Sequence, residues 1–245
     1  MAVLVLVSSG FAMAVVARLL MARGARPELA LVALVFPGWI SAIRMMTPEL
    51  LALGLALLGL MLWEQVRRGP AVLLLTLAVL TRESMLLVPV VMLVHEAWRR
   101  RLSLRTVVAL STPVVAEGVW WVVVRWRVGW WPTTAGGDRI TMPFRGLTQA
   151  VSIWHSPAAQ TVAVVLGVVL LIAAATADRS DVLAWMAIGY GLFGVVLGEV
   201  VWARWEDFGR VLLPAYACAG VVAAARWLPA PREKAAAVEA TSGVA

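Results

Sequence analysis

Hydrophobic residues occur along this chain in long runs that are separated by short polar or charged segments. Most runs approach the roughly 20 residues that an α-helix needs to cross the hydrocarbon core of a bilayer. We therefore predict membrane-spanning helices at 2–22, 29–43, 49–65, 106–128, 159–177, 182–202 and 209–227.

The run from 70 to 97 is interrupted near its middle by the polar segment Thr81-Arg82-Glu83-Ser84. Arginine clusters at 67–68 and 99–101 flank this run, and the positive-inside rule places both on the cytoplasmic side. An even number of crossings is then required, so we predict a hairpin of two short helices with its tip at the outer face. The fold class is all-α: a polytopic transmembrane bundle of about eight to nine helices, including this hairpin.

The same rule sorts the other cations into two groups. The first group is expected inside: Arg23, Arg26, Arg179, Arg226, Arg232 and Lys234. The second group is expected outside: Arg44, Arg82, Arg139, Arg145, Arg204 and Arg210. Topology alone does not call for cations on the outer face. The outer face is therefore where we expect chemistry.

Two segments lie outside the predicted spans. The longest loop, 129–157, is expected on the outer side and contains helix breakers and a short amphipathic stretch, Phe144 to Trp154, that suits an interfacial helix. The segment 230–245 is Ala-rich and polar, and is predicted to be a disordered cytoplasmic tail. Residues 1–229 are expected to form a single transmembrane domain.

Composition excludes several classes of protein. Of the 245 residues, 62% are hydrophobic and only 14% are charged, which argues against a soluble catalytic domain, a disordered chain or a coiled coil. The net charge of +7 fits Arg-rich cytoplasmic loops against anionic lipid rather than a nucleic-acid partner. One cysteine, Cys218, and two histidines, His95 and His155, do not make a usual zinc site. No nucleotide-binding motif is present, so neither a cofactor nor a metal is expected.

The first candidate site residues lie at predicted outer helix ends. Glu49 follows Thr47-Pro48 at the start of a span, where either helix capping or an outward-facing site accounts for it. Arg82 and Glu83 interrupt an apolar run, where an ionised side chain at membrane depth costs on the order of 3 kcal/mol. Arg82 and Glu83 therefore indicate a functional site or a structural ion pair. The alternative is a hairpin tip at the outer interface, where water solvates both side chains.

The stretch 202–210 is the richest in charged and aromatic side chains. Arg204, Glu206, Asp207 and Arg210 alternate there with aromatic residues. Arginine binds phosphate in a bidentate manner, although an aromatic belt at the interface also explains the pattern. Further candidates have less support: Glu117, Asp138, Arg139, Arg145, His155 and Glu199.

Three segments together resemble the GT-C superfamily of integral-membrane glycosyltransferases. They are Thr47-Pro48-Glu49 with the apolar helix after it, Leu80-Thr81-Arg82-Glu83-Ser84-Met85-Leu86-Leu87-Val88-Pro89, and the stretch from Trp205 to Pro214. The similarity covers about 29–97 and 200–225. It implies a bacterial plasma-membrane enzyme that takes sugar from a polyprenyl-phosphate donor and transfers it, on the outer face, to a cell-envelope acceptor.

The resemblance also implies roles for individual residues. Arg82 and Arg210, supported by Arg204, are expected to contact the donor phosphate, and the carboxylates Glu49, Glu83, Glu206 and Asp207 are expected to contact the sugar or the acceptor.

The acidic outer loop that carries the family's key carboxylate has no counterpart before Arg44, so no catalytic residue is assigned. The chain is expected to correspond to the C-terminal portion of such an enzyme. The alternatives are a non-catalytic membrane subunit or pseudoenzyme, and a transporter or flippase of a lipid-linked saccharide.

Overall fold

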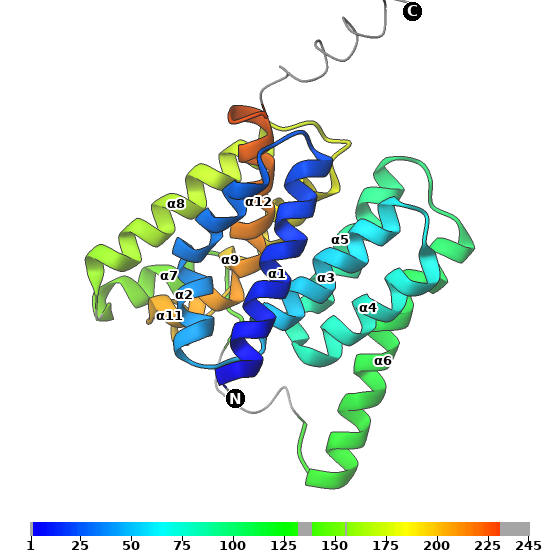
Figure 1. Ribbon diagram of the computed structural model, residues 1–245. Helices are drawn as coiled ribbons and strands as arrows, with labels where there is room; N and C mark the ends of the chain where they lie inside the picture. Colours follow the sequence, from blue (N-terminus) through cyan, green and yellow to red (C-terminus); the bar gives the residue numbers. More distant parts are fainter. Residues whose placement is uncertain (1, 132–138, 155, 231–245) are drawn as a thin grey trace, which may run out of the picture.

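The computed structural model describes residues 2–131, 139–154 and 156–230, and these residues form an all-helical structure with no β-strand (Figure 1). The helical elements in chain order are α1 (Ala2–Ala22), η1 (Pro27–Val35), α2 (Pro37–Arg44), α3 (Glu49–Glu64), α4 (Arg68–Thr81), η2 (Glu83–Leu86), α5 (Leu87–Trp98), α6 (Leu104–Val128), α7 (Arg145–Ala150), η4 (Val151–Ile153), α8 (Pro157–Ala175), α9 (Val182–Val195), α10 (Glu199–Trp202), α11 (Trp205–Val211) and α12 (Leu213–Trp227). The predicted tail at 230–245, apart from its first residue, and the loop residues 132–138 lie outside the described residues.

Within those residues, three helices are long and apolar enough to cross a membrane, namely α1, α6 and α8. Two bent pairs, η1 with α2 and α11 with α12, raise the number of candidate spans to five if each pair counts as one. The remaining apolar helices are shorter than a full span.

The predicted interruption at 81–84 is confirmed. Arg82 has an extended backbone between α4 and η2. Arg68, the first residue of α4, and Glu96, near the end of α5, both contact the indole of Trp63, so α4 and α5 return the chain to the same end of the molecule.

Two predicted spans are instead broken by proline. The segment 29–43 divides into η1 and α2, which meet at 67° where Pro37 starts α2, and 209–227 divides at Pro214 into α11 and α12, which meet at 64°. Proline lacks the backbone N–H that would continue the hydrogen bonding of the preceding helix. The two bends leave the short helices α2 and α11 packed together at one end of the molecule.

The predicted span 182–202 is wrong in its second half, because α9 ends at Val195. The backbone N–H groups of Thr141 and Phe144 donate to the carbonyls of Val196 and Val195, at 2.8 Å each. The long loop therefore takes up acceptors that a continued helix would use, and α10 is a separate short helix.

The described helices pack as one bundle around a shared hydrophobic core. Figure 1 shows α4, α5 and α6 on one side, α8 on the opposite side, and α1 and α12 between them. The most extensive pairings join α3 with α4 and α1, α12 with α9, and α4 with α6. Most of the surface of α6 is exposed and apolar, as suits a helix that faces lipid.

Charged residues gather at two opposite ends of this bundle. Glu49 and Glu64 begin and end α3, which separates them by about 23 Å at 1.5 Å per residue. At the Glu64 end, Arg23 forms ion pairs with Glu64 at 3.2 Å and with Asp181 at 2.9 Å. At the Glu49 end lie Arg82 and Arg210. Arg23, from the group expected inside, thus lies at the opposite end from Arg82 and Arg210, from the group expected outside.

Candidate functional site

The Glu49 end is organised by a close crossing of α2 and α11. A Cβ atom on Gly38 of α2 would lie only 2.1 Å from the carbonyl oxygen of Gly209 on α11. Two glycines are thus needed for the backbones to approach so closely. Because Arg210 follows Gly209 and Glu49 begins the helix after α2, this crossing brings the two charged residues together.

Three separate parts of the chain meet at the carboxylate of Glu49. The Oε1 atom lies 3.3 Å from an Nη atom of Arg82 and 3.5 Å from one of Arg210. The Glu49 side chain is only 1% exposed, whereas those of Arg82 and Arg210 are 33% and 15% exposed. The buried carboxylate therefore lies beneath two guanidinium groups that reach the surface to different extents.

Arg210 has further partners that fix its orientation. Its Nη2 atom donates to Asp207 at 2.5 Å, and its Nε atom donates to the backbone carbonyl of Glu206 at 3.1 Å. We call Glu49, Arg82, Asp207 and Arg210 the Glu49 cluster. Its two carboxylates balance its two guanidiniums in formal charge.

Arg82 reaches Glu49 because the chain is not helical at that point. Its extended backbone separates α4 from η2, and a continuous helix would give the side chain a different direction. The hydroxyl of the buried Tyr190 on α9 donates to the carbonyl of Ser84 at 2.9 Å, which holds the hairpin tip against the bundle.

The other predicted site residues lie outside the Glu49 cluster. Glu83 pairs with Arg139 at 3.3 Å, and both side chains are about half exposed. Arg204 and Glu206 line a separate cavity of about 380 Å³ together with Trp205, Ser156 and Gln160. The site residues predicted from the sequence therefore lie in three places: the Glu49 cluster, the ion pair of Glu83 with Arg139, and the cavity beside Arg204.

The cavity beside Arg204 contains residues that the sequence analysis missed. Gln160 is fully buried, and its side chain accepts from the backbone of Ser156 at 3.0 Å and donates to the carbonyl of Ala203 at 2.7 Å. Its polar side chain in an otherwise apolar helix was the available signal. This pair of bonds joins the start of α8 to the segment between α10 and α11.

The less supported candidates have diverse environments. Glu117 is buried in α6 and hydrogen-bonds to Trp121, although its Oε2 atom has no hydrogen-bond partner. Arg145 is exposed on α7, and Glu199 begins α10. Asp138 and His155 lie outside the described residues.

Thr47, two residues before Glu49, does not cap α3. Pro48 is the N-cap of α3 and no side chain caps that helix, while the Thr47 hydroxyl instead donates weakly to the carbonyl of Ala42 at 3.5 Å. The burial of Glu49 and its two cationic partners distinguish it from a solvated helix-start carboxylate.

The chemistry available at this end is electrostatic. Each guanidinium has five N–H donors in a planar arrangement that suits the oxygen atoms of a phosphate group. Throughout the ranges that the structure describes, no group of three or more His, Cys, Asp or Glu side chains converges in a way that suits a metal ion.

No protein-family model, curated protein or solved structure matches this chain significantly.

Proposed function

We propose that this chain is a membrane glycosyltransferase of the GT-C type, or the C-terminal part of one, that uses a polyprenyl-phosphate sugar donor at the outer face of a bacterial plasma membrane. The sugar goes to a cell-envelope acceptor. The observation that supports this function best is the convergence of Arg82 and Arg210 on the buried carboxylate of Glu49.

In this proposal, the two arginines bind the phosphate of the donor and neutralise the charge that grows on it as the glycosidic bond breaks. Such preorganised charges stabilise a developing anion without rearrangement during the reaction. Glu49 holds both guanidiniums in position, and Asp207 fixes Arg210 from the other side. A phosphate is already a good leaving group, so positioning contributes more than a strong acid.

The outer assignment of the Glu49 end follows from the positive-inside rule, which puts the arginine-rich segments 67–68 and 99–101 in the cytoplasm. The proposal includes about eight to nine membrane helices, in which short helices such as α4, α5 and α9 cross with the long ones. Short helices ending early suit a recessed outer site that a lipid-linked donor enters from the bilayer.

The first experiment measures binding of undecaprenyl phosphate to the purified protein in nanodiscs. Arg82→Gln and Arg210→Gln are expected to weaken binding about tenfold or more, or roughly 1.4 kcal/mol, because each removes a charged phosphate ligand. The matched control is Arg145→Gln, which removes an exposed cation of the same predicted face. Unchanged binding in both site variants would overturn the assignment.

Transfer is tested with undecaprenyl-phosphate hexoses and a cell-envelope fraction as acceptor. A transferase is supported if the wild type and the control variant transfer labelled hexose to the acceptor and the two site variants do not. A non-catalytic subunit is the second candidate, favoured by the balanced charges of the Glu49 cluster. It predicts lipid-phosphate binding without any transfer.

A further inference from the structure

A second polar cavity, of about 300 Å³, lies at the Glu64 end, far from the Glu49 cluster. It is formed where the end of α3, the start of α4 and the end of α5 approach the loop before α9. Its charged lining comes from Glu64, Arg68, Glu96, Arg99 and Arg101. The cavity is independent of the proposed transfer reaction.

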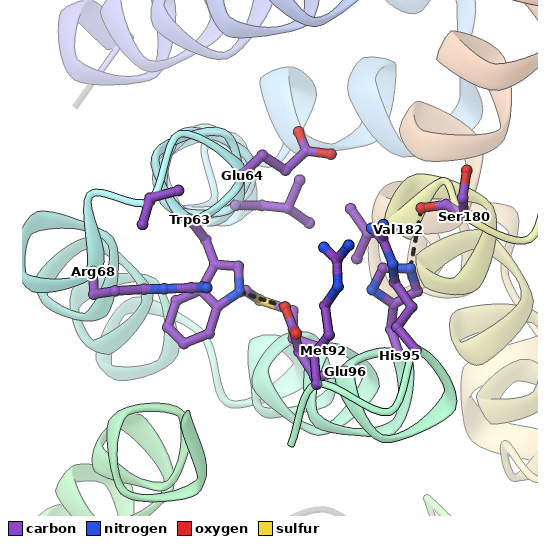
Figure 2. A pocket seen from close by; sticks show the side chains of 12 residues that line it. Trp63, Glu64, Arg68, Met92, His95, Glu96, Ser180 and Val182 are labelled. Atoms are coloured by element: carbon purple, nitrogen blue, oxygen red, sulfur yellow. Dashed lines mark hydrogen bonds between the residues drawn. The ribbon is translucent and has the colours of Figure 1, made fainter. Parts of the chain in front are cut away.

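The two carboxylates of this cavity already have partners. Glu64 pairs with Arg23 at 3.2 Å. An oxygen of Glu96 accepts from the indole N–H of Trp63 at 3.0 Å (Figure 2). The imidazole of His95 is similarly engaged, with its Nε2 atom 3.1 Å from the carbonyl of Ser180. These contacts give the cavity a defined wall.

The arginines of the cavity are used much less. Arg68 stacks on the ring of Trp63, with 3.6 Å between its Cζ atom and the ring centroid, and this contact occupies none of its N–H donors (Figure 2). The side chains of Arg99 and Arg101 form no hydrogen bond or ion pair with any residue in the described part of the chain. Several guanidinium donors are therefore available to a ligand.

The charge at this place is also unbalanced. Counting the lining residues together with the ion-paired Arg23 and Asp181, the cations exceed the carboxylates by one. A phosphodiester carries a single negative charge and matches the fork geometry of arginine. A ligand of this charge leaves the cavity neutral.

We propose that this cavity is a binding site for the phosphate group of an anionic phospholipid, held by Arg68, Arg99 and Arg101. Hydroxyl groups of a headgroup such as phosphatidylglycerol then donate to the carboxylates of Glu96 and Glu64. The cavity opens at the arginine-rich end, where the cytoplasmic leaflet of the bilayer presents anionic headgroups.

The test measures the thermal stability of the detergent-purified protein with added phosphatidylglycerol or phosphatidylcholine. Phosphatidylglycerol is expected to raise the melting temperature of the wild type more than phosphatidylcholine does. The double variant Arg99→Gln/Arg101→Gln is expected to lose this preference and to bind phosphatidylglycerol about tenfold more weakly.

The matched control is Arg100→Gln/Arg105→Gln, which removes the same charge from the same segment but from residues that do not line the cavity. A preference that persists in the cavity variant, or that falls equally in both variants, would overturn the site. The single variant Arg101→Gln, at an exposed side chain, replaces the double variant if the latter does not fold.

Inorganic phosphate serves as the soluble probe. If phosphatidylglycerol stabilises the protein and inorganic phosphate does not, the site is assigned to lipid. Stabilisation by inorganic phosphate that is lost in the cavity variant supports the same phosphate site with a soluble ligand.

Discussion

At the scale of single residues, the Glu49 cluster shows how charged groups are accommodated in an apolar bundle. A buried ionised carboxylate loses its hydration, and only nearby opposite charge offsets that loss. Glu49 meets this condition with two guanidiniums, whereas Glu83 shares a partly exposed ion pair with Arg139. The fold therefore depends on the ion pairs of the buried Glu49, whereas water also stabilises the exposed Glu83.

The isosteric substitution Glu49→Gln is expected to destabilise the protein by about 3 kcal/mol, because it leaves two partly buried arginines without their shared counter-charge. Thermal unfolding in detergent measures this effect. The control Glu83→Gln breaks an exposed pair and is expected to cost less than about 1 kcal/mol. Equal losses in the two variants would contradict the distinction between buried and exposed pairs.

At the scale of elements, the site depends on helices that stop early. Proline separates η1 from α2 and α11 from α12, and the extended backbone at Arg82 separates α4 from η2. Each break leaves a helix end near Glu49 rather than in the middle of a span. The close crossing of α2 and α11 then sets the distance between Glu49 and Arg210.

Gly38→Ala tests this crossing directly. Its Cβ atom would lie 2.1 Å from the carbonyl oxygen of Gly209, so α2 and α11 must separate, at an expected cost of about 1–3 kcal/mol. The control is Gly10→Ala in α1, where an added Cβ atom has no atom within 4 Å. The control is expected to melt at or slightly above the wild-type temperature, since alanine favours a helix. If Gly38→Ala melted with the wild type, the crossing would not require glycine.

At the scale of the whole molecule, the two charged ends give the bundle a direction. The Arg23 ion pairs and the cavity lined by Arg68, Arg99 and Arg101 share one end, and the Glu49 cluster occupies the other. Membrane proteins keep arginine-rich segments on the cytoplasmic side. The orientation predicted from sequence therefore assigns the Glu49 cluster and the proposed lipid site to opposite leaflets.

Cysteine labelling tests this orientation in whole cells. The single cysteine, Cys218, is buried and is replaced by alanine to give an unreactive background. A membrane-impermeant maleimide is expected to label Thr148→Cys, at an exposed position of α7, and to leave Arg105→Cys unlabelled until the membrane is permeabilised. The reverse pattern would place the Glu49 end in the cytoplasm.

Local patterns were sufficient to predict the all-helical class, the interruption at Arg82 and the separation of Arg23 from Arg82 and Arg210. Each depends on residues close together in the chain: apolar runs, a polar break, and cations beside helix ends. The same patterns identified Glu49, Arg82 and Arg210 as candidate site residues. They did not predict which of these residues meet, because such contacts join residues distant in the chain.

Tertiary structure decided the rest. The end of α9 depends on backbone donors of residues 141 and 144, and these donors lie outside the apolar run 182–202. Likewise, the contact of Glu49 with Arg210 depends on the glycine crossing of two helices, and the cavity with Arg99 and Arg101 depends on three helix ends meeting. Hydrophobicity along the sequence determines what is buried in the membrane, whereas packing in three dimensions determines which charges face one another.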